Sequence, residues 1–185
     1  MPATLQPKSQ ILNSLVRAFR RNGYDGASLS RLSDETGLKR ASLYHHFPGG
    51  KEEMARAVLI SANTNFQEAV LGALDQPGTP KQRLVAMAAA LSNFYDGGKE
   101  TCLLALMTTG EGREVLAPQV REGLTGWINT LASVLEQAGQ PQASARERAQ
   151  DAVARVQGAL VLSRGLGDTK AFERLVARLP HDLLA

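Results

Sequence analysis

The chain has 185 residues, of which 43% are hydrophobic and 21% are charged, and it carries a net charge of +3. This length allows one or two compact domains with buried cores rather than many, and the composition is ordinary for a soluble globular protein. No stretch approaches ~20 uninterrupted apolar residues, so we expect no membrane span. The single cysteine, Cys102, cannot form an internal disulfide framework, which indicates a cytoplasmic protein.

The charge is distributed unevenly along the chain. Residues 1–51 contain eight Lys and Arg against three Asp and Glu, whereas residues 52–185 contain thirteen against fifteen. A basic N-terminal module is attracted to the phosphate backbone of nucleic acids. The competing interpretation is a solvated cationic face, and charge alone does not separate the two.

Ala and Leu are abundant, and no run of β-branched residues alternates with period two, so we predict an all-α fold. The first helix spans residues 8–22, because apolar residues recur there at helical spacing before Gly23 ends it. Ser28 caps a short second helix that ends at Gly37. A third helix runs over residues 40–47, and its Leu43 and Phe47 share one face.

Glycine and proline clusters divide the rest of the chain into further helices. Their predicted spans are 51–74, 80–95, 102–107, 113–117, 118–138, 144–164 and 169–179. Ser144 and Glu147 have the spacing of a capping box, and Pro180 is expected to follow the last helix. We therefore predict nine or ten helices in two domains, residues 1–50 and residues 51–185.

The segment from Ser28 to Lys51 has the layout of a helix-turn-helix, in which the second short helix enters the major groove. The start of that helix offers donors and small side chains with no acidic residue among them, which suits base edges and phosphates. The candidate DNA-binding residues are Ser28, Arg31, Lys39, Arg40, Ala41, Ser42, Tyr44, His45 and Lys51. Ser28 is also a structural cap, and the alternative for the others is an ordinary exposed helix face.

This segment resembles the DNA-binding domain of the TetR family. The resemblance rests on Thr36-Gly37-Leu38 and on the run SLYHHFPGGKEE, which begins at Ser42. The form of that run is similar to the LmrA/YxaF-like subgroup. The close resemblance covers about residues 8–60, and the chain departs from the family pattern at Ser33 and at Arg40-Ala41.

The resemblance implies an N-terminal three-helix helix-turn-helix domain followed by a C-terminal helical bundle for ligand binding and dimerisation. It implies a homodimeric repressor that binds double-stranded, pseudo-palindromic operator DNA and is released by a small-molecule inducer. The dimer contact would involve the Trp127 helix and the penultimate helix. Small residues that permit close helix approach lie on the penultimate helix at Ala152, Gly158, Ala159 and Ser163, and packing within the subunit is the alternative.

Seven residues of the C-terminal part are candidates for lining a ligand pocket. They are Met87, Leu91, Phe94, Tyr95, Cys102, Met107 and Trp127. Residues of these types more often belong to the core than to a pocket, so core packing is the main alternative for each. Cys102 is interpreted as a small buried hydrophobic residue, and a redox-sensing role is the lesser alternative.

No catalytic motif or phosphate-binding loop is present, so we expect no enzyme activity and no cofactor. His45 and His46 are adjacent and point in different directions, and the only other histidine is His181, so we expect no metal site. Two alternatives stay open. One is a DNA-binding regulator of this fold without an inducer, and the other is a helical small-molecule-binding protein or enzyme with an incidental basic N-terminus.

Overall fold

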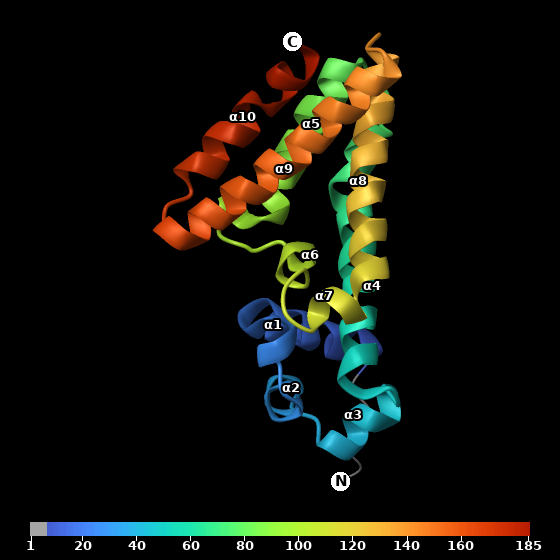
Figure 1. Ribbon diagram of the computed structural model, residues 1–185, viewed down its shortest axis with the longest axis vertical. Helices are drawn as coiled ribbons and strands as arrows, with labels where there is room; N and C mark the ends of the chain where they lie inside the picture. Colours follow the sequence, from blue (N-terminus) through green and yellow to red (C-terminus); the bar gives the residue numbers. More distant parts are fainter. Residues whose placement is uncertain (1–6) are drawn as a thin grey trace. The chain divides into compact units, whose positions relative to one another are not determined.

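The computed structural model describes residues 7–185, and within them it contains ten α-helices, two short 3-10 helices and no strand (Figure 1). The predicted all-α fold is confirmed. The helices form two compact units, which we describe separately. The first unit comprises the described residues up to Asn63 together with Leu103–Arg121, and the second comprises Thr64–Cys102 and Glu122–Ala185. The predicted domain boundary at residue 50 stays a prediction.

The first unit is built around three N-terminal helices. Its elements are α1 (Lys8–Gly26), α2 (Leu29–Thr36), α3 (Arg40–His46), the first part of α4 (Gly50–Ala69), α6 (Leu103–Leu106), α7 (Gly112–Val115) and the start of α8 (Ala117–Gln137). Their apolar faces enclose a core that includes the fully buried Ile11, Leu15, Phe19, Leu32 and Leu43. Helix α1 bends at Gly23, whose φ of 64° is left-handed, so the predicted stop appears as a kink followed by one more turn.

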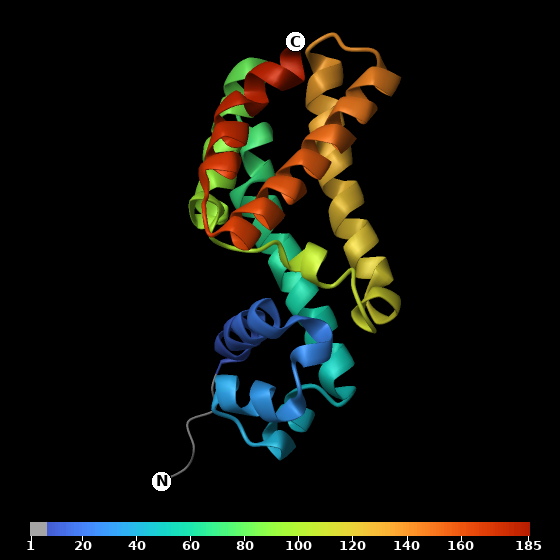
Figure 2. The same ribbon diagram turned by 60° about the vertical axis from the view of Figure 1, so that its left-hand side comes forward.

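The second unit packs long helices against one another. It contains the end of α4, the remainder of α8, two 3-10 turns (Leu71–Leu74 and Asp96–Gly98), α5 (Pro80–Phe94), α9 (Gln142–Leu166) and α10 (Lys170–Leu184). Helix α10 lies against both α9 and α5 (Figure 2). Helix α5 begins with a capping box in which Thr79 and Gln82 bond reciprocally.

Two of the predicted helix boundaries are wrong near Pro141 and Leu74. Helix α9 starts at Gln142 rather than at a Ser144 cap, because Pro141 has a φ of −58° and its carbonyl already accepts the Ala145 N–H at 2.9 Å. Ser144 and Glu147 therefore lie inside the helix and form no capping box. Helix α4 ends at Ala69, and Leu71–Leu74 continues as a 3-10 turn.

The prediction that the last helix ends before Pro180 is also wrong, because α10 continues to Leu184. Proline removes one backbone donor and disfavours a continuing helix, but tertiary contacts hold the final turn. Arg155 on α9 donates to Asp182 at 2.7 Å, and Gln140 donates to the Leu183 carbonyl at 2.7 Å. The Leu183 side chain is buried as well.

The ion pair at Asp182 predicts a pH dependence for this attachment. The hydrogen bond from the Arg155 guanidinium lowers the pKa of the Asp182 carboxyl below its ordinary value. A carboxyl whose pKa is lower in the folded state stabilises the fold above its unfolded pKa, and this contribution is lost as pH falls through the folded value. We expect Asp182→Asn to lower the free energy of unfolding at pH 7, with the difference from the unsubstituted chain vanishing at acidic pH. Urea unfolding across a pH series measures this, and a difference that does not shrink as the pH is lowered would contradict it.

Candidate nucleic-acid interface

The turn between α2 and α3 is fixed by local hydrogen bonds. The Ser28 hydroxyl caps α2 by accepting the Arg31 N–H at 3.3 Å, as predicted. Gly37 ends α2 with a φ of 69°, a conformation that favours glycine. The buried Thr36 hydroxyl donates to the Leu32 carbonyl at 2.7 Å and accepts the Leu38 N–H at 3.3 Å. Ser33, where the chain departs from the family pattern, adds a hydrogen bond from its hydroxyl to the Leu38 carbonyl.

Helix α3 has one buried face and one exposed face. Leu43 is fully buried, and Phe47, which follows the helix, is 1% exposed. The opposite side carries the exposed candidates, which are Lys39, Arg40, Ala41, Tyr44 and His45, while Ser42 is half-buried. Because positions 40, 41, 44 and 45 share a helical face, the burial of Leu43 directs them outward together. No Asp or Glu occurs between Lys39 and Phe47, so this face is cationic.

Tyr44 and Lys51 are held by contacts with the start of α4 and with α1. Gly50 has a φ of 66°, and a Cβ built on it would lie 3.2 Å from Cε1 of the Tyr44 ring, so the absence of a side chain lets the ring rest there. The Lys51 ammonium lies 4.2 Å from the centroid of the Tyr24 ring, a cation–π contact. Burial raises the pKa of the Tyr24 phenol, with the Glu52 carboxylate adding to the effect.

Lys8, at the start of α1, was not among the predicted candidates. Its ammonium lies 5.6 Å from the Phe47 ring centroid, which brings a further cation to the end of α3. In the sequence, only the positive charge of Lys8 could have suggested a DNA contact. Its position beside residue 47 depends on the tertiary fold and could not be read from the sequence.

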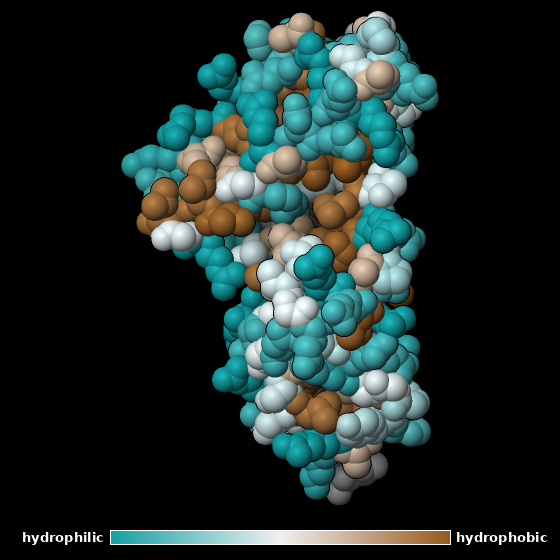
Figure 3. All heavy atoms as spheres, in the orientation of Figure 1, coloured by the Kyte–Doolittle hydropathy of each residue, from teal (hydrophilic) through white to brown (hydrophobic). Residues whose placement is uncertain are grey.

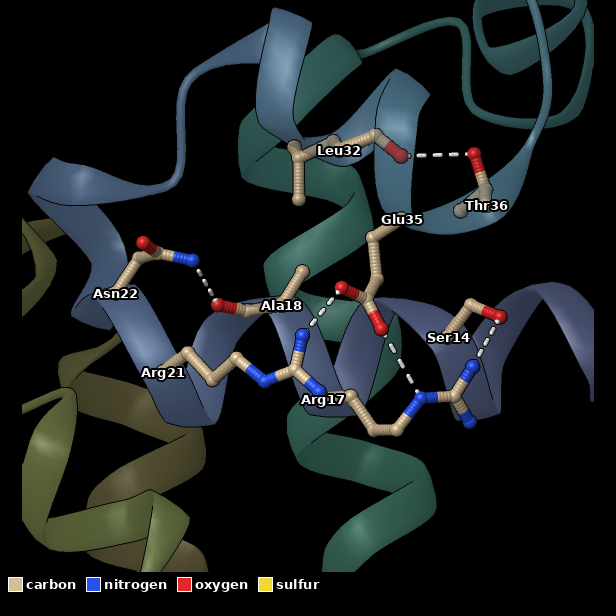
Figure 4. A network of polar contacts seen from close by, with 8 residues as sticks. All are labelled: Ser14, Arg17, Ala18, Arg21, Asn22, Leu32, Glu35 and Thr36. Carbon is tan, nitrogen blue, oxygen red and sulfur yellow. Dashed lines mark hydrogen bonds and ion pairs between the residues drawn. The ribbon is translucent and has the colours of Figure 1, made fainter.

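Several basic residues of α1 and α2 have partners within the chain. Glu35 accepts from Arg17 at 3.1 Å and from Arg21 at 2.9 Å, and so links α1 to α2 (Figure 4). Arg31, a predicted DNA contact, donates to the Asn22 side chain at 3.1 Å and to the Gly26 carbonyl at 2.8 Å. These contacts give Arg31 a structural role at the junction of α1 and α2.

The start of α4 is neutralised from within the chain. The Gly49 N–H donates to the Glu53 carboxylate at 2.6 Å, so the positive end of the helix already has an anion in place. Lys51 is the cation of this turn, and it is half-buried with its ammonium against the Tyr24 ring.

The seven ligand-pocket candidates are divided between the two units. Six belong to the second unit, where Phe66 brings Phe94 and Trp127 together with ring centroids at 5.2 and 4.7 Å. The other members of this group, Met87, Leu91, Tyr95 and Cys102, are buried. Met107 belongs to the first unit and lines a cavity there. The burial of Cys102 agrees with its interpretation as a hydrophobe.

Residues 7–185 contain no cluster of His, Cys, Asp and Glu that could hold a metal ion. Among the same residues, no helix has both the length and the apolar character needed to cross a membrane.

The Glu35 network predicts a small, salt-sensitive contribution to stability. Arg17 and Arg21 are 53% and 67% exposed, so solvent screens both pairs. We expect Glu35→Gln to lower the free energy of unfolding by less than about 1 kcal/mol at low salt, and by less again at 1 M salt. Urea unfolding at two ionic strengths measures this. The matched control is Asp34→Asn, a neighbouring exposed carboxylate, and an equal loss in the control would argue against the network.

Comparison with known proteins agrees with this geometry. Residues 11–58 match the family described as "Bacterial regulatory proteins, tetR family", and residues 80–178 match "Transcriptional regulator LmrA/YxaF-like, C-terminal domain". The "HTH-type transcriptional regulator LmrA" of Bacillus subtilis is 27% identical over 161 residues, which cover 84% of this chain and 85% of that protein. The "HTH-type transcriptional repressor AcnR" of Corynebacterium glutamicum is 30% identical over 78 residues, or 38% of this chain and 42% of that one.

The fold is also similar to that of solved structures. A TetR transcriptional regulator from Legionella pneumophila superposes with a TM-score of 0.84 at 22% identity, over 98% of each chain. The LmrA/YxaF-like match alone spans more than half of the 185 residues. The chain therefore belongs to the TetR family of bacterial transcriptional regulators, in its LmrA/YxaF-like group, and is not an enzyme.

Proposed function

We propose that this regulator is a ligand-responsive repressor that binds a pseudo-palindromic operator as a homodimer in the cytoplasm and is released by a small molecule. The observation that carries the DNA-binding part is the exposed, acid-free face of α3, held outward by the buried Leu43 and the fixed turn at Gly37. Residues 1–50 form the proposed DNA-binding domain, and residues 51–185 form the proposed ligand-binding and dimerisation domain.

In this proposal the first turn of α3 enters the major groove and reads base edges. Arg40 and Lys39 have the donors to bond guanine O6 and N7, and Ala41 suits contact with a thymine methyl group. The exposed His45 extends the same face by one turn.

Other residues at the edge of this face would position the protein by contacts with the phosphate backbone. Tyr44 is 44% exposed, and its hydroxyl, the Ser42 hydroxyl and the Lys51 ammonium are suitable donors. Ser28 and Arg31 are exposed but already engaged in the chain, so a phosphate contact from either one would add to an existing structural role.

An apolar stripe on α9 supports the homodimer. Val161, Leu162 and Leu166 are 64%, 51% and 73% exposed, and Gly158 has open space where a Cβ would lie. Figure 3 shows hydrophobic residues gathered at this end of α9. Three of the four small residues considered from the sequence, Ala152, Ala159 and Ser163, are instead buried within the subunit.

Isologous pairing of two chains through this stripe produces two-fold symmetry. Two reading helices related by a two-fold axis match half-sites one helical turn apart, roughly 34–36 Å between centres.

A buried donor supports the ligand response. The Trp127 side chain is 2% exposed, and its indole N–H has no hydrogen-bond partner among the described residues. An unpaired buried donor costs about 1–3 kcal/mol, which an acceptor on a bound small molecule would offset. A ligand that prefers a conformation with wrongly spaced reading helices would lower operator affinity by its differential affinity for the two conformations.

The combined change Lys39→Ala and Arg40→Ala tests the DNA interface. We expect operator affinity to fall at least tenfold, because each base or phosphate contact contributes about 1–3 kcal/mol. The salt dependence of binding should also become shallower. The measurement is fluorescence anisotropy with a duplex that the purified protein selects from a random pool. The control is Lys170→Ala with Arg174→Ala on α10, and unchanged affinity in the α3 variant would refute the assignment.

Leu162→Asp tests the proposed dimer. A buried unpaired charge opposes association, so we expect sedimentation velocity to show a monomer in place of a dimer. Operator affinity should fall with it, since half of the contacts are lost from each complex. The matched control is Val85→Asp, which charges a side chain that is 51% exposed on α5. A dimer that survives the Leu162 change, or is lost equally in the control, would exclude this stripe as the interface.

A further inference from the structure

The first compact unit contains a cavity of about 230 Å³ away from α3. It opens between the end of α6, the helix α7 and the first turns of α8. Its lining residues are Met107, Thr108, Arg113, Ala117, Val120 and Arg121. All six belong to the same unit as the DNA-reading helices.

The floor of the cavity is apolar. Met107 is fully buried, Val120 is 8% exposed, and Ala117 is half-buried between them and the opening. Such a surface favours a hydrocarbon group over water. An engineered cavity of about 150 Å³ holds benzene, so this one suits a ligand of about ten non-hydrogen atoms.

The rim of the cavity is cationic. Arg113 and Arg121 are exposed, and neither guanidinium makes a hydrogen bond or ion pair with the described residues. No carboxylate lines the cavity. Helix α8 begins at Ala117, so the positive end of its dipole adds to the field there. The Thr108 hydroxyl is not a further donor, because it donates to the Ala105 carbonyl at 2.7 Å.

We propose that this cavity binds a small organic anion, with a carboxylate between Arg113 and Arg121 and an apolar body against Met107 and Val120. Two guanidinium groups hold a carboxylate through charge-assisted hydrogen bonds. The apolar floor selects against small inorganic anions, because they have no apolar group to pack against Met107 and Val120.

Occupation of the cavity has a physical route to the reading helices. The Glu111 N–H, just before α7, donates to the Asp25 carboxylate of α1 at 3.2 Å. Gly112 lies so close to Tyr24 that a Cβ on it would come within 2.8 Å of the tyrosine Cβ. Arg56 of α4 donates to the Val115 carbonyl at 3.3 Å. A ligand that displaces α7 would therefore move α1 and α4 through these contacts. The release of DNA that we expect from this movement rests on the proposed function.

The test of the site uses phenylacetate as the anionic probe and phenylacetamide as its neutral isostere. The chain has four methionines, so ¹³C labelling of the methionine methyl groups gives a site-specific NMR readout, with Met54 and Met87 as internal references. We expect phenylacetate to shift the Met107 signal with a Kd on the order of 1 mM, as befits a fragment. Phenylacetamide should bind at least tenfold more weakly. Equal binding of the two, or no shift at Met107, overturns the site.

The arginines are tested by Arg113→Gln with Arg121→Gln, which should weaken phenylacetate binding at least tenfold without changing the Met54 signal. Arg174→Gln, an exposed arginine on α10, is the matched control and should bind normally. Undiminished binding in the double variant overturns the proposal.

A last arm separates the site from the proposed function. Saturating phenylacetate is added to the complex of the unsubstituted protein with its selected operator duplex. We expect release of the DNA, and no release from the Arg113→Gln, Arg121→Gln variant. A Met107 shift with unchanged operator affinity overturns the coupling, whereas failure to bind any duplex overturns the proposed function and leaves the Met107 result standing.

Discussion

The whole N-terminal unit depends on the tight turn that separates α2 from α3. Gly37 supplies a left-handed backbone, and the Thr36 hydroxyl satisfies the Leu38 N–H inside the turn. With this angle fixed, Leu43 and Phe47 enter the core, and the opposite side of a short helix must face solvent. The direction of the basic side chains thus follows from apolar burial on the other face. Their own charges do not determine it.

Local chemistry explains which features could be predicted from the sequence. The Ser28 cap, the turn at Gly37 and the shared face of Leu43 and Phe47 each involve residues only a few positions apart. The start of α9 also has a local cause, because Pro141 takes the N-terminal position that Ser144 was expected to cap, so this boundary was missed although the signal was in the sequence. The end of α10 could not be predicted in this way, because distant groups hold its last turn beyond Pro180.

In the candidate site, too, the features set by local sequence were predictable and those set by tertiary contacts were not. The α3 face was predictable because it is a single helical surface. The partners of Arg31, Arg17 and Arg21 were not predictable, since a charged residue in a sequence gives no sign of which hydrogen-bond acceptor lies opposite it in space. The apolar candidates for a pocket were the least predictable, because core packing and ligand contact require the same side chains. Met107 and Trp127 are distinguished from their neighbours only by a cavity and by an unpaired N–H.

The carboxylate of Glu53, bonded to the Gly49 amide, has a consequence for how tightly this protein should hold arbitrary DNA. A free helix start would attract any phosphate regardless of sequence, and the chain fills that place itself. Nonspecific phosphate contacts then contribute less of the total attraction between protein and DNA, and contacts that differ between bases must contribute more. We therefore expect nonspecific DNA to bind this protein less tightly than it would with a free helix start, which matters when an operator competes with an entire chromosome.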